Sequence, residues 1–150
     1  MDEWRAPLIA EAKTWEGTRY VPRGRVKGVG VDCGGLLYEV FNPWFGPFAA
    51  FPDDYPPDWA LHGNEERYLD FIKPHVYEVP QVQPGGISLF HLGQAYAHAA
   101  IMLDNGNYIH AWGRMREGSV IQTPQLSMRR FGARYGHGFS VKHFEPIPHG

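Results

Sequence analysis

The chain has 150 residues, 43% of them hydrophobic and 15% aromatic, and 14 basic against 16 acidic side chains give a net charge of −2. This length fits one domain, residues 1–150, with enough apolar surface to fill a core. No run of basic residues marks a nucleic-acid surface, no apolar stretch approaches the roughly 18 residues of a membrane span, and the N-terminus lacks a signal-peptide pattern. We therefore expect neither a nucleic-acid partner nor a membrane span.

The first predicted element is a short helix over residues 7–15. Pro7 suits the first turn of a helix, and Gly17 suits its end. Three apolar residues recur on one face of this helix: Leu8, Ala12 and Trp15. We interpret the helix as a packing element.

Residues 18–31 have no convincing period and carry four basic side chains, Arg19, Arg23, Arg25 and Lys27. We expect a basic loop there. The sequence Gly28-Val29-Gly30 lacks the other parts of a phosphate-binding motif, so a nucleotide site is not expected.

The only cysteine, Cys33, stands at the predicted start of a second helix. Asp32 is suited to cap this helix, and apolar residues follow at helical spacing, namely Leu36, Leu37, Val40 and Phe41. The N–H groups and the dipole at a helix start favour a thiolate, which lowers a cysteine pKa from about 8.5 to roughly 3.5–7.5 when a basic group is also near. Cys33 is therefore a candidate nucleophile, and a buried structural thiol is the alternative.

Two glycines, Gly34 and Gly35, fall in the first turn of this helix. Each costs about 1 kcal/mol relative to alanine within a helix, so we expect them to allow a close approach to the backbone around Cys33. The helix is predicted to stop at Asn42-Pro43, because a proline disfavours the α conformation of the residue before it.

The rest of the chain changes from helices to strands. Residues 43–59, rich in proline and aromatic residues, are expected to cover the domain without regular structure, and a third helix is predicted from residue 64 to a stop before Pro74. Six short runs then predict strands over residues 75–79, 87–92, 96–103, 107–112, 119–122 and 139–144. This order predicts an α+β domain in which N-terminal helices, including the Cys33 helix, pack on an antiparallel sheet.

Two histidines, His98 and His110, lie in predicted strands that Asp104-Asn105-Gly106 joins. A two-residue loop would leave them on opposite faces of the hairpin. A three-residue loop, with Gly106 in the left-handed conformation, pairs Leu103 with Asn107 and Ala100 with His110, which puts both histidines on one face. In that register His98 can act as the base for Cys33, while His110 reaches the far nitrogen of the His98 ring.

Two alternatives stay open for these histidines. Each can be a core histidine with satisfied hydrogen bonds. A metal site built from His91, His98 and His110 is the other alternative, although the chain lacks the usual ligand spacings. We expect no metal and no other cofactor.

These residues together resemble the NlpC-type papain-like cysteine peptidases, cell-wall hydrolases of bacteria and phages. Asp32-Cys33-Gly34-Gly35-Leu36 resembles the Asp-Cys-Ser-Gly-Leu nucleophile motif of that family, and residues 84–90 resemble its Pro-Gly-Asp segment. Residues 98–111 resemble its histidine hairpin. Tyr20 resembles a tyrosine that lies beside the nucleophile in the family. The resemblance spans roughly residues 7–112 and continues into the last strands.

The resemblance implies a papain-like fold and a cysteine endopeptidase. It implies Cys33, His98 and His110 as the catalytic triad, and Tyr20, Asp32 and Gly34 as substrate or oxyanion residues. The implied substrate is a peptidoglycan stem peptide, cut between D-glutamate and the diamino acid. Two positions depart from the motifs: Gly34 replaces a serine and Gly86 replaces an aspartate.

Residues 4–17, 27–30 and 55–60 are most similar to phage-type members of the family that are associated with tail assembly. This similarity implies phage tail proteins as partners, and a location in the virion or in the cytoplasm before assembly. Two other functions stay open: a structural tail component that has the fold without turnover, and an acyltransferase or transglutaminase-like enzyme that uses the same nucleophile.

Overall fold

The structure is a computed structural model that describes residues 2–45, 67–92, 95–114, 117–128 and 140–147. The main sheet has six antiparallel strands in the order β3-β8-β4-β5-β6-β7. These strands are β3 (Val76–Val79), β4 (Ile87–Leu92), β5 (Ala95–Met102), β6 (Asn107–Arg114), β7 (Glu117–Pro124) and β8 (Val141–Pro146). The predicted α+β class and antiparallel sheet are confirmed.

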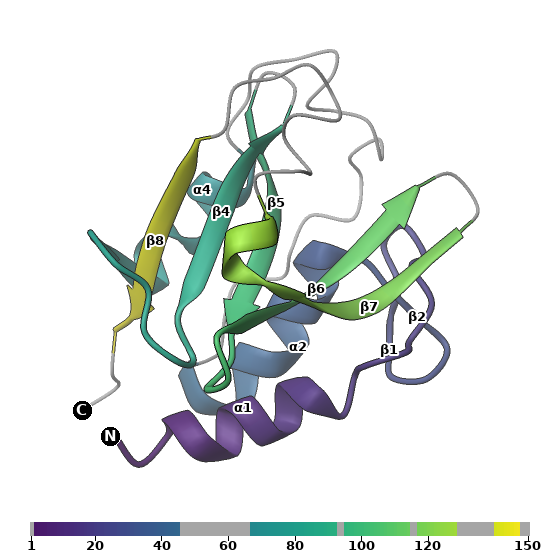
Figure 1. Ribbon diagram of the computed structural model, residues 1–150, viewed down its shortest axis with the longest axis horizontal. Coiled ribbons are helices and arrows are strands. Elements are labelled where there is room, and N and C mark those ends of the chain that lie inside the picture. The colour runs from purple at the N-terminus through teal and green to yellow at the C-terminus, as the bar shows by residue number, and fades with distance from the viewer. Residues whose placement is uncertain (1, 46–66, 93–94, 115–116, 129–139, 148–150) are drawn as a thin grey trace.

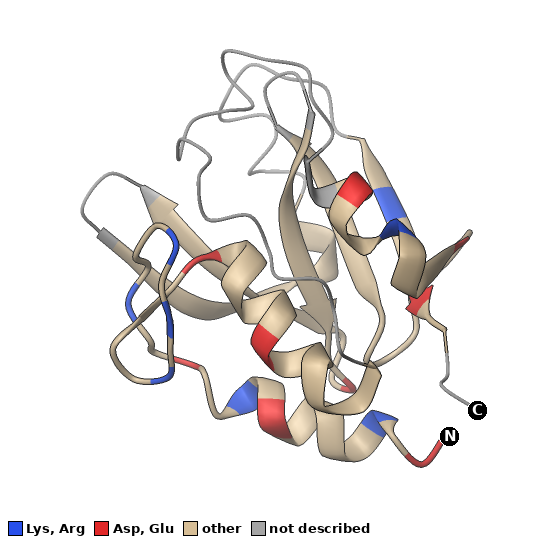
Figure 2. Cartoon of the chain, turned by 180° about the vertical axis from the view of Figure 1, so that it is seen from behind, with Lys and Arg blue, Asp and Glu red and all other residues tan. Residues whose placement is uncertain are grey.

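Helices cover one face of this sheet. They are α1 (Arg5–Lys13), α2 (Cys33–Phe45) and α4 (Arg67–Ile72), and the short 3-10 turn η1 (Lys73–His75) follows α4 directly. A second 3-10 turn, η2 (Gln125–Ser127), lies on the opposite face (Figure 1). Helices α2 and α4 lie behind the sheet in Figure 1 and in front of it in Figure 2. The longest described helix, α2, has 13 residues, and no described helix is long and apolar enough to cross a membrane.

Helix α1 begins two residues before its predicted start and ends at Lys13. Its predicted apolar face is confirmed, because Leu8 and Ala12 are fully buried and Trp15, in the turn that follows the helix, is 4% exposed. That turn reaches Gly17, whose φ of 86° is a conformation that favours glycine.

The prediction of a loop over residues 18–31 is wrong in part. A small antiparallel hairpin forms there, with strands β1 (Arg25–Val26) and β2 (Gly30–Val31). Strands of two residues are too short to produce an alternating pattern in the sequence. The hairpin packs beside the start of α2.

The predicted stop of the second helix at Asn42-Pro43 is also wrong, since α2 continues to Phe45 with Pro43 inside its last turn. Phe45 is 3% exposed and packs edge-on against Trp4, with 4.9 Å between the ring centroids. A proline near the end of a helix removes few intrahelical bonds, so this packing outweighs the loss. Residues 46–66 lie outside the described residues, and the predicted cover and the start of the third helix therefore stay predictions there.

Two hydrophobic clusters lie on the two sides of the sheet. The larger one joins α1, α2 and α4 to alternate strand residues such as Ala99, Ile101 and Ile109. The smaller one consists of Phe90, Ala100, Met102, Tyr108 and Met128. Side chains alternate between the two faces along a strand. His98 and His110 therefore stand at strand positions of the same face as Ala100, Met102 and Tyr108 of the smaller cluster.

The strands β5 and β6 form a fork. Their paired residues are Ile101 with Ile109 and Met102 with Tyr108, next to the turn that joins them. Beyond these pairs β6 stays paired with β7 over its whole length, and Figure 1 shows this two-stranded ribbon leaving β5. The hairpin β1–β2 and the start of α2 lie beside this ribbon (Figure 1).

Candidate active site

Asp32 fixes the start of α2. Its Oδ1 accepts a hydrogen bond from the Gly35 N–H at 2.7 Å, and its Oδ2 accepts one from the Arg23 N–H at 2.8 Å. The first bond is that of a helix N-cap, as predicted. The second holds the β1–β2 hairpin at Arg23, a residue with a φ of 64°. One buried carboxylate therefore joins the hairpin to the first turn of the helix.

Gly35 allows the close approach that we expected. A Cβ atom at this position would overlap the carbonyl oxygen of Gly24 in the hairpin. Any larger residue would separate the hairpin from the helix, because the obstructing atom belongs to the backbone. Gly34 lies buried in the same turn.

Cys33 is the first residue of α2 and is 5% exposed. Its Sγ atom lies 3.9 Å from the carbonyl oxygen of Ala97 in β5. Ala97 directly precedes His98. The packing of α2 on the sheet therefore brings the sulfur to the strand that carries His98.

The histidine hairpin has the three-residue register. The Leu103 N–H donates to the carbonyl oxygen of Asn107 at 2.9 Å, and Gly106 has a φ of 84°. Ile101 pairs with Ile109, which is the register that aligns Ala100 with His110. The predicted turn and register are confirmed.

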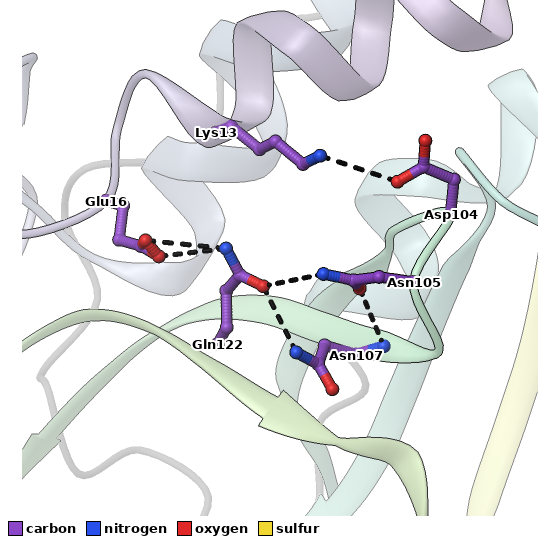
Figure 3. A network of polar contacts seen from close by, with 6 residues as sticks. All are labelled: Lys13, Glu16, Asp104, Asn105, Asn107 and Gln122. Carbon is purple, nitrogen blue, oxygen red and sulfur yellow. Dashed lines mark hydrogen bonds and ion pairs between the residues drawn. The ribbon is translucent and has the colours of Figure 1, made fainter.

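Polar contacts hold this turn against its neighbours (Figure 3). The Gln122 side-chain oxygen in β7 accepts hydrogen bonds from Asn105 at 3.1 Å and Asn107 at 3.2 Å, and its nitrogen donates to Glu16 at 2.9 Å. Lys13 forms an exposed ion pair of 3.4 Å with Asp104. The turn that sets the histidine register is thus tied to both α1 and β7.

His98, His110 and Thr123 form a hydrogen-bonded chain across the strands. The Nε2 of His98 lies 2.8 Å from the Nδ1 of His110, and the Nε2 of His110 lies 2.9 Å from the Oγ1 of Thr123. The three residues are 4%, 0% and 7% exposed. The predicted contact between the His98 and His110 rings is therefore present.

Aromatic rings enclose His98. Its ring centroid lies 5.0 Å from that of Trp112 and 6.1 Å from that of Phe90. Burial, and then the neighbouring His110, lower the pKa of His98 well below its ordinary value. Burial lowers the pKa of His110 to about 4. Both imidazoles are therefore neutral at pH 7.

Tyr20 packs against the β6–β7 ribbon at the end away from the Asp104-Asn105-Gly106 turn, and its hydroxyl lies within electrostatic reach of Cys33. A Cβ atom at Gly113 in β6 would overlap its ring, and its backbone N–H donates to the carbonyl oxygen of Gly118 at 2.9 Å. Burial above all, and then the charges of Cys33 and Asp32, raise the pKa of the Tyr20 hydroxyl far above its ordinary value. The hydroxyl therefore stays protonated and able to donate a hydrogen bond near Cys33.

The other candidates from the sequence have different surroundings. His91 packs edge-on against Tyr96 at 5.1 Å. Within the described part of the chain, no three His, Cys, Asp or Glu side chains gather in a way that could hold a metal ion. Of the basic residues before Cys33, Arg25 lies over the Tyr38 ring at 4.7 Å and Lys27 pairs with Glu11 at 2.8 Å, while Arg19 and Arg23 are exposed.

Sequence reasoning missed three neighbours of the histidine pair: Phe90, Trp112 and Thr123. A signal existed for Trp112, because the three-residue register that aligns Ala100 with His110 also sets His98 opposite Trp112. Thr123 had no such signal, since its strand was predicted to end at residue 122. Its position depends on the pairing of β6 with β7, which aligns Tyr108 with Thr123.

No protein-family model and no curated protein matches the sequence. Among solved structures, the chain is similar to the crystal structure of the NlpC/p60 domain of peptidoglycan hydrolase SagA, with a TM-score of 0.52 and 21% sequence identity. The similarity covers 91% of this chain and 95% of that chain. The chain therefore has the papain-like α+β fold of an NlpC/p60 domain.

Proposed function

We propose that the protein is a cysteine peptidase that hydrolyses amide bonds of peptidoglycan stem peptides, with Cys33 as nucleophile, His98 as base and His110 as the residue that orients His98. The observation that supports this most is the 2.8 Å contact between the two imidazoles, one residue along β5 from the carbonyl that Cys33 contacts. A nucleophile, a base and an orienting group in this order form the usual arrangement for acyl transfer.

The lowered pKa of His98 determines the protonation state that we propose for Cys33 and His98 before the reaction. A buried imidazole with a low pKa favours a neutral thiol and a neutral ring over a preformed ion pair. The thiol proton then moves to Nδ1 of His98 as the sulfur attacks the carbonyl carbon. The C–N bond breaks when His98 gives this proton to the leaving amine. A water molecule then gives a proton to His98 and cleaves the thioester, and His98 returns this proton to the sulfur of the released Cys33.

The oxyanion of the tetrahedral intermediate needs hydrogen-bond donors. The Cys33 backbone N–H, at the start of α2, is one proposed donor. The Tyr20 hydroxyl is the other, since its raised pKa keeps it protonated. Asp32 acts through structure, by holding Gly35 and Arg23 in place.

The substrate class rests on the fold and on charge. The solved neighbour is a domain of a peptidoglycan hydrolase. The positive charge of the exposed residue Arg19 suits a carboxylate of a stem peptide. The bond between D-glutamate and the diamino acid is the finer proposal for the site of cleavage, and the association with phage tails stays a sequence-based prediction.

The test is the incubation of purified muropeptides with the wild type and with Cys33→Ala, followed by mass spectrometry of the fragments. We expect cleavage by the wild type, no cleavage by the variant and similar melting temperatures. Cleavage by the folded variant at the wild-type rate would contradict the nucleophile assignment.

The same experiment separates the remaining functions. With an added amine, products in which the amine replaces the leaving group indicate an acyltransferase. A folded wild type that forms neither product indicates a structural component.

A further inference from the structure

We propose that Thr123 is a positioning residue that accepts the last hydrogen bond of the chain from His98 through His110 and thereby holds His98 in the tautomer that can take a proton from Cys33. This inference rests on the proposed function in that it takes His98 as the base. The observations that carry it are the two contacts of 2.8 and 2.9 Å that run from His98 Nε2 to Thr123 Oγ1.

The proton count on the two rings decides the direction of the chain. A neutral imidazole carries one N–H, so the bond between the rings needs a donor on one side and a bare nitrogen on the other. If His98 donates from Nε2, its Nδ1 is bare and can accept the thiol proton. His110 then accepts at Nδ1, carries its own proton on Nε2, and donates to Thr123.

The opposite direction is incompatible with a protonated His98. An imidazolium carries N–H groups on both nitrogens, so His98 must donate to His110 from Nε2 once Nδ1 has received the thiol proton. His110 must then present a bare Nδ1, and its N–H on Nε2 points at Thr123. The hydroxyl of Thr123 must therefore act as an acceptor during catalysis.

The hydrogen bond from His110 to Thr123 is buried, so its loss is not compensated by water. Thr123 is 7% exposed and His110 is fully buried, so water does not readily replace the hydroxyl. A buried N–H that loses its acceptor retains the full penalty of its desolvation. Removal of the Thr123 hydroxyl should therefore remove the preference for the productive tautomer, although Thr123 is separated from His98 by the whole His110 ring.

The test compares Thr123→Val, which keeps the shape and removes the hydroxyl, with Thr123→Ser, which keeps the hydroxyl. The first measurement is ring ¹⁵N NMR of His98 and His110 at pH 7, where we expect both rings of the wild type and of Thr123→Ser to carry the proton on Nε2. In Thr123→Val we expect a mixture of tautomers. The second is the rate of muropeptide cleavage, which we expect to fall roughly ten-fold or more in Thr123→Val and to be largely retained in Thr123→Ser.

A Thr123→Val protein with the wild-type tautomers and rate would overturn the inference, as would a Thr123→Ser protein as impaired as Thr123→Val. If Thr123→Val does not fold, Thr123→Ala provides the same comparison with less side-chain volume. The NMR measurement uses no substrate. A wild type that fails to cleave muropeptides but shows the expected tautomers and their loss in Thr123→Val would refute the proposed function and leave the positioning by Thr123 intact.

Discussion

Two of the buried polar clusters among the described residues differ in charge. The first, which we call the Arg5 clamp, consists of Arg5, Glu145 and the Pro84 carbonyl. Arg5 donates to Glu145 at 2.9 Å and to the carbonyl oxygen of Pro84 at 2.7 Å, and the two charged residues are 7% and 3% exposed. The second is the chain of His98, His110 and Thr123, in which both rings are neutral at pH 7.

The two clusters show what burial does to polar groups that are paired in different ways. The Arg5 clamp joins the start of α1 to β8 through an ion pair between Arg5 and Glu145. Removal of one partner of a buried ion pair destabilises the fold strongly, because the other charge stays buried without compensation. The histidine chain carries no charge at rest, so each ring keeps one nitrogen without a proton. The first arrangement suits a structural link, and the second suits a base.

The largest expected effect on stability comes from removing one member of the clamp. Glu145→Ala leaves the Arg5 guanidinium without its buried carboxylate partner, and the carboxylate that stays, Asp2 at 3.2 Å, is largely exposed. We expect a loss of about 3–5 kcal/mol in the free energy of unfolding, measured by urea denaturation. The double variant Arg5→Met/Glu145→Leu should recover most of this loss, because it removes both charges and keeps apolar volume. A loss below about 1 kcal/mol in Glu145→Ala would show that the clamp is not a structural link.

The histidine chain predicts a loss of stability in acid. The folded-state pKa of His110 is about 4, below the ordinary value near 6.5, so the unfolded chain takes up a proton at a higher pH than the folded one. Stability is fully present above pH 6.5 and falls as the pH drops toward 4, by roughly 3 kcal/mol from His110 alone. Thermal melts of the wild type and of His110→Gln between pH 7 and pH 4 measure this difference. A wild-type slope no steeper than that of His110→Gln would contradict the prediction.

A smaller effect is expected where the turn before β4 meets the clamp. Gly86 stands where the Pro-Gly-Asp motif of the NlpC-type peptidases has an aspartate. A Cβ atom at Gly86 would lie 2.9 Å from the Gln83 carbonyl oxygen and 3.0 Å from the Phe144 carbonyl oxygen. We expect Gly86→Asp and Gly86→Ala each to cost about 1–3 kcal/mol in urea denaturation. Stabilisation by Gly86→Asp would show that this turn adapts and that the aspartate is accommodated.

The smallest effect is expected at the surface. Lys13 and Asp104 are both largely exposed and 3.4 Å apart, so Lys13→Gln should change the free energy of unfolding by less than about 0.5 kcal/mol. The histidine register should be unchanged, since Gln122 also holds the turn. A larger loss, or altered ring ¹⁵N signals of His98, would show that the exposed pair controls the buried one.

Much of this arrangement was predictable because it follows from local rules. The cap at Asp32, the tight approach at Gly35 and the register set by Gly106 each depend on a few adjacent residues. The continuation of α2 past Pro43 was not predictable, since it depends on Phe45 meeting Trp4 from a distant part of the chain. The position of Thr123 depends likewise on the pairing of two strands whose connection gives little signal in the sequence.

The Asp104-Asn105-Gly106 turn limits which sequence changes the hairpin can accept during evolution. Its residues can vary as long as a glycine-like conformation is kept at residue 106, but their number cannot. Deletion of one residue would shift β6 against β5 by one position and put His98 and His110 on opposite faces of the hairpin. A deletion or insertion at this turn should therefore break the contact between the two imidazoles, whereas a substitution that keeps the conformation of residue 106 should preserve it.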